Sequence, residues 1–293
     1  MSFFETVDQP TQRGFKTLTE QMAELRAASA NPVQRTRTGL RQLDKAIRGI
    51  GLGELLMFAA RSGNGKSAFA TQFIANNPDT PTIFFSLEMP ASRVMQRLYA
   101  QVTDAPAADL EESAMRNQLP ADLEALQEKL PYSVVVDRPG LRWEDMAAYM
   151  DNYSDFYSRR PVVVLIDYLE LVAGMKTKGE ITSASVDAIA NQAKEFAVEQ
   201  NVGVVMLHQL NTSVKEWEPP NKGSLRYGGL AESDFVVGLW RPGLDPELKG
   251  NDAKLREREV GINVIKNRIF GDEPRNLRYT LTHSMRLTDL GPR

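Results

Sequence analysis

The sequence predicts an α/β fold in which a mostly parallel central sheet is covered by helices on both faces. Compact apolar runs alternate with segments of helical pattern, and continuous apolar runs are typical of strands that are buried on both sides. The links between the last runs are shorter, which predicts an antiparallel extension at one edge of the sheet. The predicted strands cover residues 54–60, 82–87, 133–136, 162–166, 203–207, 235–239, 261–266 and 276–281.

Segments with a helical pattern connect these strands, and one further segment precedes them. Residues 1–35 are polar except for one amphipathic stretch at about 15–28. The apolar residues that recur in this stretch are Phe15, Leu18, Met22 and Leu25. We therefore expect one domain over residues 36–293 and an N-terminal arm over residues 1–35. The helix of this arm could be a solvated flap, a strut within its own chain or a segment that docks on a neighbouring subunit. The other predicted helices cover residues 66–76, 92–101, two short stretches within 104–130, 143–157 with its aromatic residues in the core, and 183–199.

Composition narrows the possible classes of function. The chain has no cysteine and only two histidines, which excludes a disulfide framework, a thiolate metal site and a histidine-rich zinc site. The N-terminus lacks the pattern of a signal peptide, and no apolar run approaches the roughly 20 residues of a membrane span. We therefore expect a cytoplasmic protein with no membrane partner. The net charge of −3 still allows a few basic loops per subunit to bind nucleic acid.

The stretch Ala60–Ser67 (ARSGNGKS) has the composition and the context of a phosphate-binding loop. It follows a predicted strand and opens a predicted helix, whose N-terminal N–H groups favour an anion. Lys66 can reach the outer phosphates of a nucleotide, and the Ser67 hydroxyl can bind Mg²⁺. Ala60 replaces the usual first glycine, and the alternative is a glycine-rich turn before an ordinary helix. The predicted nucleotide-binding residues are Arg61, Ser62, Gly63, Asn64, Gly65, Lys66, Ser67 and Ala68.

Polar side chains end three further predicted strands. Asp167 follows a strand at the edge where open α/β sheets bind ligands, and could hold Mg²⁺ or simply cap the next turn. Glu88 could orient and polarise the water that attacks the γ-phosphate, or it could cap a helix that begins near Ala91. Gln209 could sense the γ-phosphate through hydrogen bonds. Four such strand ends together favour a nucleotide-hydrolysing site.

Two of these motifs are similar to those of a known family, the DnaB-type replicative helicases. Residues 60–61 (AR) and 65–70 (GKSAFA) resemble the phosphate loop of the family, which also has alanine in place of the first glycine. Residues 85–90 (FSLEMP) resemble its second motif, which is highly distinctive and carries the catalytic glutamate, here Glu88. Together these two matches identify the chain as resembling that family over about residues 35–287.

Weaker matches follow in the same order as in the family. Residues 166–171 (IDYLEL) resemble the strand that carries the metal-binding aspartate, with Glu170 where glutamine is more usual. Residues 208–211 (HQLN) resemble the motif with the γ-phosphate-sensing glutamine, and residues 38–44 resemble the entry to the domain. The resemblance implies catalytic roles for Glu88, Lys66 and Gln209, and for Lys266 and Arg268, which would reach the nucleotide of a neighbouring subunit.

Residues 225–229 (LRYGG) look like the DNA-contacting loop of the family, with Tyr227 where an acidic residue is usual. The implied DNA-binding residues are Arg226, Tyr227, Gly228 and Gly229, with Lys176 and Lys178 of a polar loop as second candidates. The resemblance implies a RecA-like, ATP-dependent replicative helicase with Mg²⁺ that moves along single-stranded DNA inside a homo-oligomeric, hexameric ring. A primase or a helicase loader would be a further partner.

The family's N-terminal helical domain has no counterpart in this sequence. We therefore expect a minimal helicase of the kind that phages or plasmids encode, acting in a bacterial host, or a fragment. The main alternative is a RecA-like DNA-dependent ATPase, such as a recombination or helicase-loading factor, that does not unwind DNA. A binding module with vestigial hydrolysis is disfavoured by the complete set of catalytic residues. A small-molecule kinase is disfavoured by residues 85–90 and by the lack of an acceptor-binding lid.

Overall fold

The computed structural model describes residues 16–30, 35–116, 118, 120, 123–167, 172, 183–225 and 229–290. The chain divides into two units, residues 1–34 and 35–293, and each is described by itself below.

The first unit contains helix α1 (Leu18–Ala30). Thr17 and Glu20 form a capping box at its start, because Thr17 Oγ1 accepts the Glu20 N–H at 3.3 Å and Glu20 Oε2 accepts the Thr17 N–H at 2.6 Å. The helix therefore begins later than the amphipathic pattern indicates, and Phe15 lies outside the described residues. The apolar side chains exposed on α1 are those of Leu18, Met22 and Leu25.

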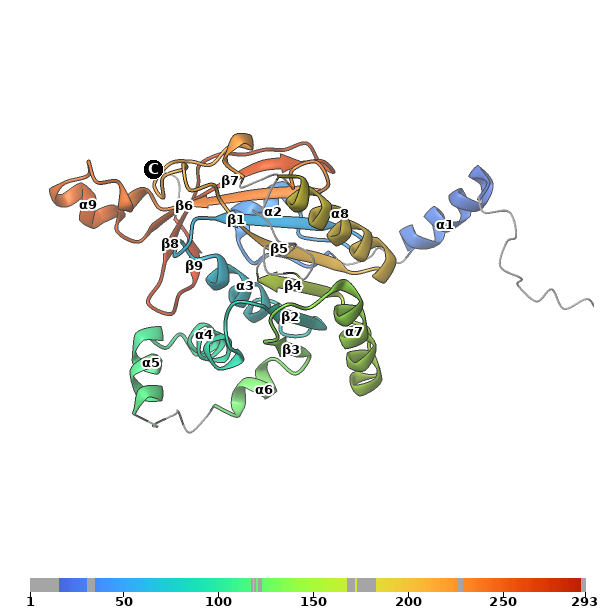
Figure 1. The fold of residues 1–293 in the computed structure, drawn as a ribbon, viewed down its shortest axis with the longest axis horizontal. Helices are drawn as coiled ribbons and strands as arrows, with labels where there is room; N and C mark the ends of the chain where they lie inside the picture. The colour runs from blue at the N-terminus through green and yellow to red at the C-terminus, as the bar shows by residue number, and fades with distance from the viewer. Residues whose placement is uncertain are drawn as a thin grey trace, which may run out of the picture. The chain divides into compact units, whose positions relative to one another are not determined.

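In the second unit, the described residues form one sheet of nine strands in the order β3-β2-β4-β5-β1-β6-β7-β8-β9 (Figure 1). The strands from β3 to β6 in this order are parallel, and β7, β8 and β9 are antiparallel to their neighbours. The strands are β1 (Leu55–Ala60), β2 (Thr82–Ser86), β3 (Ser133–Val136), β4 (Val163–Asp167), β5 (Gly203–Gln209), β6 (Phe235–Trp240), β7 (Glu259–Asn267), β8 (Leu277–Leu281) and β9 (Leu287–Asp289). The predicted mostly parallel sheet with an antiparallel extension is confirmed. Only β9 has no counterpart among the predicted strands.

Helices cover both faces of this sheet (Figure 1). The helices of this unit are α2 (Arg41–Ile47), α3 (Lys66–Ala75), α4 (Ala91–Thr103), α5 (Ala107–Met115), α6 (Ala125–Lys129), α7 (Trp143–Tyr157), α8 (Ser183–Gln200), α9 (Gly250–Arg256) and the 3₁₀ turns η2 (Lys222–Ser224) and η3 (Pro242–Leu244). Helices α2 and α9 have no counterpart among the predicted helices. None of the helices that the structure describes combines the length and the apolar character needed to span a bilayer.

Each face of the sheet has its own apolar core. One core contains Phe58 of β1 and Phe69 of α3, whose rings stack with centroids 3.7 Å apart. The other contains Met57 of β1 together with side chains of α7 and α8, such as Met150 and Ala193. Met57 and Phe58 belong to different cores because successive side chains of a strand point to opposite faces. The two cores hold the strand ends in fixed register.

A partly buried ion pair joins α8 to the start of β6. Lys194 Nζ lies 2.6 Å from Asp234 Oδ2 and 2.7 Å from the carbonyl oxygen of Gly53, and Asp234 Oδ2 also accepts the Leu55 N–H at 2.9 Å. The Asp234 side chain is only 7% exposed. We predict that Lys194→Met lowers the free energy of unfolding by about 3 kcal/mol, because the carboxylate remains buried without its charged partner.

Urea denaturation checks this prediction, with Lys215→Met as the matched control. Lys215 pairs with Glu218 at the surface, where both side chains are about half exposed. The control should therefore lose less than about 1 kcal/mol. Equal losses for the two variants would show that the Lys194–Asp234 pair contributes nothing beyond a surface contact.

Candidate active site

The loop between β1 and α3 has the backbone conformation that phosphate binding requires. Gly63 (φ 80°) and Gly65 (φ 104°) both lie in the left-handed region that favours glycine. A Cβ added at either position would meet no atom within 4 Å, so both faces of the turn are open. Gly65 directly precedes α3, whose first N–H groups are therefore directed at the loop. Lys66 Nζ is held 3.2 Å from the carbonyl oxygen of Ala60, over the same loop.

Ser67 and Asp167 meet beside this loop although they lie 100 residues apart in the chain. The Ser67 hydroxyl donates a hydrogen bond of 2.7 Å to Asp167 Oδ2. Asp167 is fully buried, and its Oδ1 has no hydrogen-bond partner among the described residues. Burial raises the pKa of Asp167 above its usual value, the Ser67 bond opposes this shift, and the nearby Glu88 carboxylate adds to it. A cation would relieve this unfavourable environment.

The residues present fit a Mg²⁺ ion that binds together with a nucleotide. The part of the chain that the structure describes holds no group of three or more His, Cys, Asp or Glu side chains able to bind a metal. Proteins usually hold Mg²⁺ through one or two oxygen ligands, with phosphates and waters completing its shell. Ser67 Oγ and the unpartnered Asp167 Oδ1 are ligands of this kind.

Glu88 follows β2, the strand that pairs with β4 and its last residue Asp167. In the register of β2 and β4, Ser86 pairs with Asp167, and Glu88 follows with an exposed side chain. Glu88 does not cap α4, because the Ala91 N–H donates instead to Asp137 Oδ2 at 2.8 Å. The structure thus contradicts the capping alternative and leaves the Glu88 carboxylate accessible at the edge where the loop lies.

Arg97 of α4 belongs to the same cluster and has no counterpart among the predicted site residues. Burial lowers the pKa of its guanidinium, while the charge of Asp167 and, more weakly, that of Glu88 act in the opposite direction. Its neighbours Val94 and Leu98 are buried. An arginine between apolar positions of the helix that follows Glu88 is the signal by which the sequence could have indicated it.

Gln209 completes the cluster from the other side of the loop. It ends β5 and pairs with Ala60 in the register of β1 and β5. The N–H of the next residue, Leu210, donates to the carbonyl oxygen of Ala60 at 3.1 Å. Four neighbouring strands therefore deliver the loop, Asp167, Glu88 and Gln209 to one edge of the sheet, at the carboxyl ends of the parallel strands, where α/β proteins bind ligands.

Lys266 and Arg268 lie at the opposite ends of the strands, where the parallel strands begin. Lys266 pairs with Val236 near the start of β6, because β7 runs antiparallel to the other strands. The start of β6 pairs with Leu56, whereas the loop follows Ala60, and this stretch of β1 is about 13 Å long. Burial lowers the pKa of Lys266, and the charge of Arg268 adds to this shift. Neither side chain can therefore serve the loop of its own chain.

The predicted DNA-contacting loop is described only at its ends. Leu225 is buried and forms an isolated bridge with Leu210, and Gly229 is buried with φ 82°. Several residues of the predicted sites lie outside the described residues, namely Arg226, Tyr227, Gly228, Lys176, Lys178 and residues 168–171. Gly229 lies at the base of the loop, where its N–H donates to Asp187 Oδ1 at 2.6 Å.

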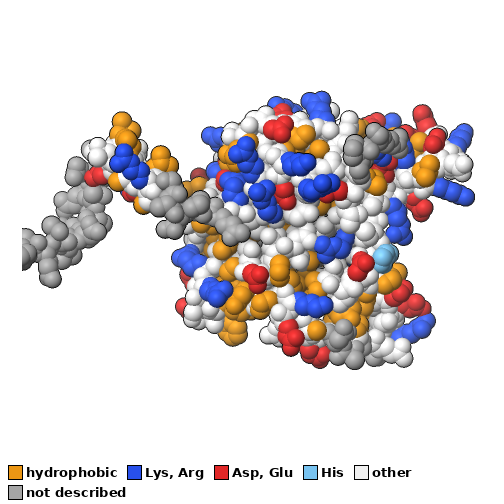
Figure 2. All heavy atoms as spheres, turned by 180° about the vertical axis from the view of Figure 1, so that it is seen from behind, with side chains coloured by type: hydrophobic (Ala, Val, Ile, Leu, Met, Phe, Trp, Pro, Cys, Tyr) orange, Lys and Arg blue, Asp and Glu red, His pale blue; other side chains and the backbone are white. Residues whose placement is uncertain are grey.

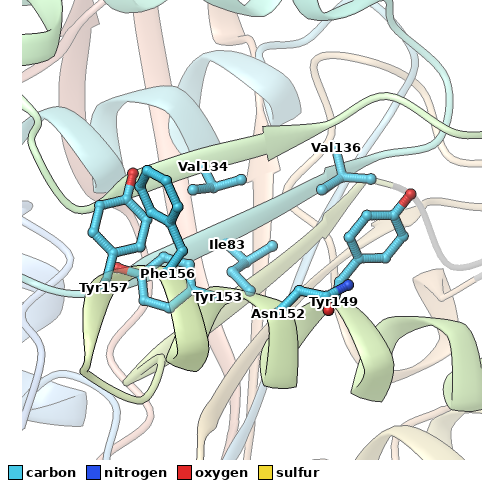
Figure 3. Close-up of a pocket in the computed structure, with 8 residues that line it drawn as sticks. All are labelled: Ile83, Val134, Val136, Tyr149, Asn152, Tyr153, Phe156 and Tyr157. Atoms are coloured by element: carbon cyan, nitrogen blue, oxygen red, sulfur yellow. The ribbon is translucent and has the colours of Figure 1, made fainter.

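A separate aromatic cavity of about 240 Å³ lies between α7 and strands β2 and β3 (Figure 3). Rings of α7 line one side and apolar side chains of the two strands line the other. Its lining residues are Ile83, Val134, Val136, Tyr149, Asn152, Tyr153, Phe156 and Tyr157. Phe156 is 80% exposed, so the expectation that the aromatic residues of this helix lie in the core is wrong for it. The cavity shares no residue with the cluster around the loop.

The surface charge is uneven although the net charge is negative. The exposed basic residues at and around α2 are Arg37, Arg41, Lys45 and Arg48. Three of them, Arg37, Arg41 and Lys45, line a hollow of about 330 Å³. Figure 2, which views the molecule from behind Figure 1, shows Lys and Arg side chains gathered over part of the face that it draws. A negative net charge of −3 therefore coexists with a local group of basic side chains.

Comparison with known proteins identifies one family. The sequence matches the family described as DnaB-like helicase C terminal domain over residues 36–281. It is 26% identical over 230 residues to the replicative DNA helicase DnaB of Buchnera aphidicola, and this match covers 73% of this chain and 49% of that protein. It is 28% identical over 213 residues to the replicative DNA helicase DnaC of Bacillus subtilis, and this match covers 70% of this chain and 46% of that protein. The chain thus spans about half the length of the curated relatives it matches.

Solved structures support the fold. One described as an ATPase domain matches with a TM-score of 0.77 and 21% identity, over 94% of this chain and 99% of that chain. A DnaB-like replicative helicase, described with its interactions with primase, matches with a TM-score of 0.74 and 21% identity, over 94% and 68%. These likenesses confirm the predicted RecA-like fold.

Proposed function

Because the chain belongs to the family of DnaB-like helicase C-terminal domains, we propose that it is the ATP-hydrolysing motor of a replicative DNA helicase. The observation that carries the proposal is the convergence of the phosphate loop with Asp167, Glu88 and Gln209 at one sheet edge. We further propose that residues 36–293 form the motor and that residues 1–35 form an arm that docks on a neighbouring subunit.

The residues at the carboxyl ends of the parallel strands would each have a separate role in ATP hydrolysis. Residues 61–68 would bind the phosphates of ATP, with Lys66 on the outer ones. Ser67 and Asp167 would hold Mg²⁺, which neutralises charge on the phosphates when bound. Glu88 would accept a proton from the attacking water, because its exposed carboxylate lies beside Asp167. Gln209 would donate a hydrogen bond to the γ-phosphate or to that water.

The opposite position of Lys266 and Arg268 supports a site that is shared between subunits. Each nucleotide would be bound by the loop of one chain and approached by these two side chains of the next. Repetition of one such head-to-tail contact closes into a ring when the rotation between subunits allows it. We propose a homo-oligomeric, hexameric ring, as the family resemblance implies.

Single-stranded DNA would pass through this ring. Arg226, Tyr227, Gly228 and Gly229 are the proposed contacts, with Lys176 and Lys178 as second candidates. Contacts to phosphates give little sequence preference and strong dependence on salt. A solved relative is described with primase, and we propose a primase or a helicase loader as a further partner. We place the activity in the cytoplasm of a bacterial host, with a phage or plasmid as the proposed source.

We predict that single-stranded DNA stimulates ATP hydrolysis by the protein. The active particles should have the mass of a hexamer when it is measured by light scattering. The same particles should displace a strand from forked DNA, and raising the salt concentration should weaken both activities. Hydrolysis that single-stranded DNA leaves unchanged would contradict the proposal. Stimulated hydrolysis without strand displacement would instead favour a RecA-like DNA-dependent ATPase that does not unwind.

A further inference from the structure

The connection from β5 to β6 runs from the carboxyl ends of the parallel strands, called the carboxyl edge here, back to their amino ends, called the amino edge. At the carboxyl edge, Leu225 bridges to Leu210, which directly follows Gln209. At the amino edge, Asp234 precedes β6, and its carbonyl oxygen accepts the Arg268 N–H at 2.9 Å. The implied DNA loop lies between these two points. One short segment therefore adjoins the nucleotide of its own chain, the DNA and the residues that face the next subunit.

Gly229 is the fixed point on the downstream side of this loop. It is buried, and a Cβ at this position would lie 2.6 Å from Met57 Cε. Its carbonyl oxygen accepts a hydrogen bond of 2.8 Å from Ser233 Oγ, and its N–H donates to Asp187 Oδ1 at 2.6 Å. Asp187 belongs to α8 and is the partner that satisfies this buried N–H, a group that proteins seldom leave unpaired.

The turn that follows Gly229 is held by Lys266. The Lys266 ammonium donates to the carbonyl oxygens of Leu230 and Ala231 at 2.7 Å and 2.8 Å. The same side chain is the one proposed to reach the phosphates of the neighbouring nucleotide. A rotation of the chain about Gly229 would therefore move the carbonyl oxygens that hold Lys266.

We propose that Asp187 is a positioning residue that couples DNA binding to ATP hydrolysis by fixing Gly229. When DNA engages the loop, Gly229 acts as a pivot held by Asp187, so that the chain turns about it and the turn at Leu230 and Ala231 carries Lys266 with it. In a competing role, Asp187 would accept the Gly229 N–H only until a DNA phosphate replaced it as acceptor. This role is disfavoured because Gly229 is buried, where a phosphate does not reach. The proposal rests on the proposed function.

Asp187→Ala, Asp187→Asn and the control Glu195→Ala test the proposal in the full chain. Glu195 is an exposed carboxylate of the same helix with no hydrogen bond or ion pair among the described residues. ATP hydrolysis is measured with and without single-stranded DNA, and DNA affinity by fluorescence anisotropy. Asp187→Ala should keep the basal rate within about twofold and lose about tenfold in DNA stimulation, since one buried N–H loses its acceptor. Asp187→Asn should retain most of the stimulation, because its amide oxygen still accepts the bond.

The outcomes separate the coupling from a structural role and from the proposed function itself. Equal loss of basal and stimulated rates in Asp187→Ala would mean that Asp187 is merely structural, and would overturn the proposal. So would full stimulation in this variant, or DNA binding tighter than in the wild type. An unchanged Glu195→Ala supports the assignment to Asp187. Wild-type hydrolysis that does not respond to DNA would instead refute the proposed function.

Discussion

Glu88→Gln should lower the steady-state rate of ATP hydrolysis by about 10³-fold while ATP still binds with nearly unchanged affinity. The carboxylate can take a proton from the attacking water, and an amide of the same shape cannot. Glu88 makes no cap for α4, and its side chain is exposed beside Asp167, so the substitution removes no structural contact of the described residues. Phosphate release measures the rate, and a fluorescent ATP analogue measures the affinity.

Glu111→Gln is the matched control for this prediction. Glu111 is a surface glutamate that pairs with Arg93 at 2.6 Å, with both side chains about half exposed. Its loss should leave hydrolysis at the wild-type rate, because a surface pair contributes little. Turnover in Glu88→Gln equal to that of the control would remove Glu88 from its assigned role.

Arg268→Ala should also lower the rate of hydrolysis by about 10³-fold, because an arginine supplied by a neighbouring subunit stabilises the charge of the transition state. The Arg268 side chain is exposed at the edge of the sheet opposite the phosphate loop. Its removal therefore leaves the nucleotide-binding residues of its own chain untouched. Arg275→Ala is the control, since Arg275 is exposed and has no hydrogen bond or ion pair among the described residues.

Mixing inactive chains tests the shared site directly. Arg268→Ala chains keep Lys66, and Lys66→Ala chains keep Arg268, so about one interface in four of a random mixed ring is complete. Activity should reappear when the two variants are mixed and exchanged, although each is inactive alone. A mixture as inactive as its components would show that Arg268 acts within its own chain or not in hydrolysis at all.

Patterns within short stretches of sequence were enough to predict the strands that carry the loop, Asp167, Glu88 and Gln209. Each apolar run of a buried parallel strand is visible by itself, and the polar residue that ends it is visible too. Strand β9 was missed because Leu287–Asp289 is too short to show a pattern. It becomes a strand only through pairing with β8, as in the pair Thr280 and Thr288.

Arg97 and Asp187 were missed for a related reason. Each lies on a helix, where a charged residue is ordinarily a solvated one, and the apolar neighbours of Arg97 are the one local sign that it differs. Arg97 joins the cluster because α4 brings its charge near those of Asp167 and Glu88. Asp187 gains its role because α8 packs beside the connection that contains Gly229. Both placements depend on the packing of distant segments.

The sequence alone determined the α/β fold class and which side chains end the parallel strands, because the alternation of apolar runs, glycines and polar residues is a local property of the chain. Only the tertiary structure decided that Ser67 meets Asp167 and that Lys266 and Arg268 lie at the far edge of the sheet. Both facts follow from strand order and from the reversed direction of β7, and these are set by contacts between residues that are far apart in the chain.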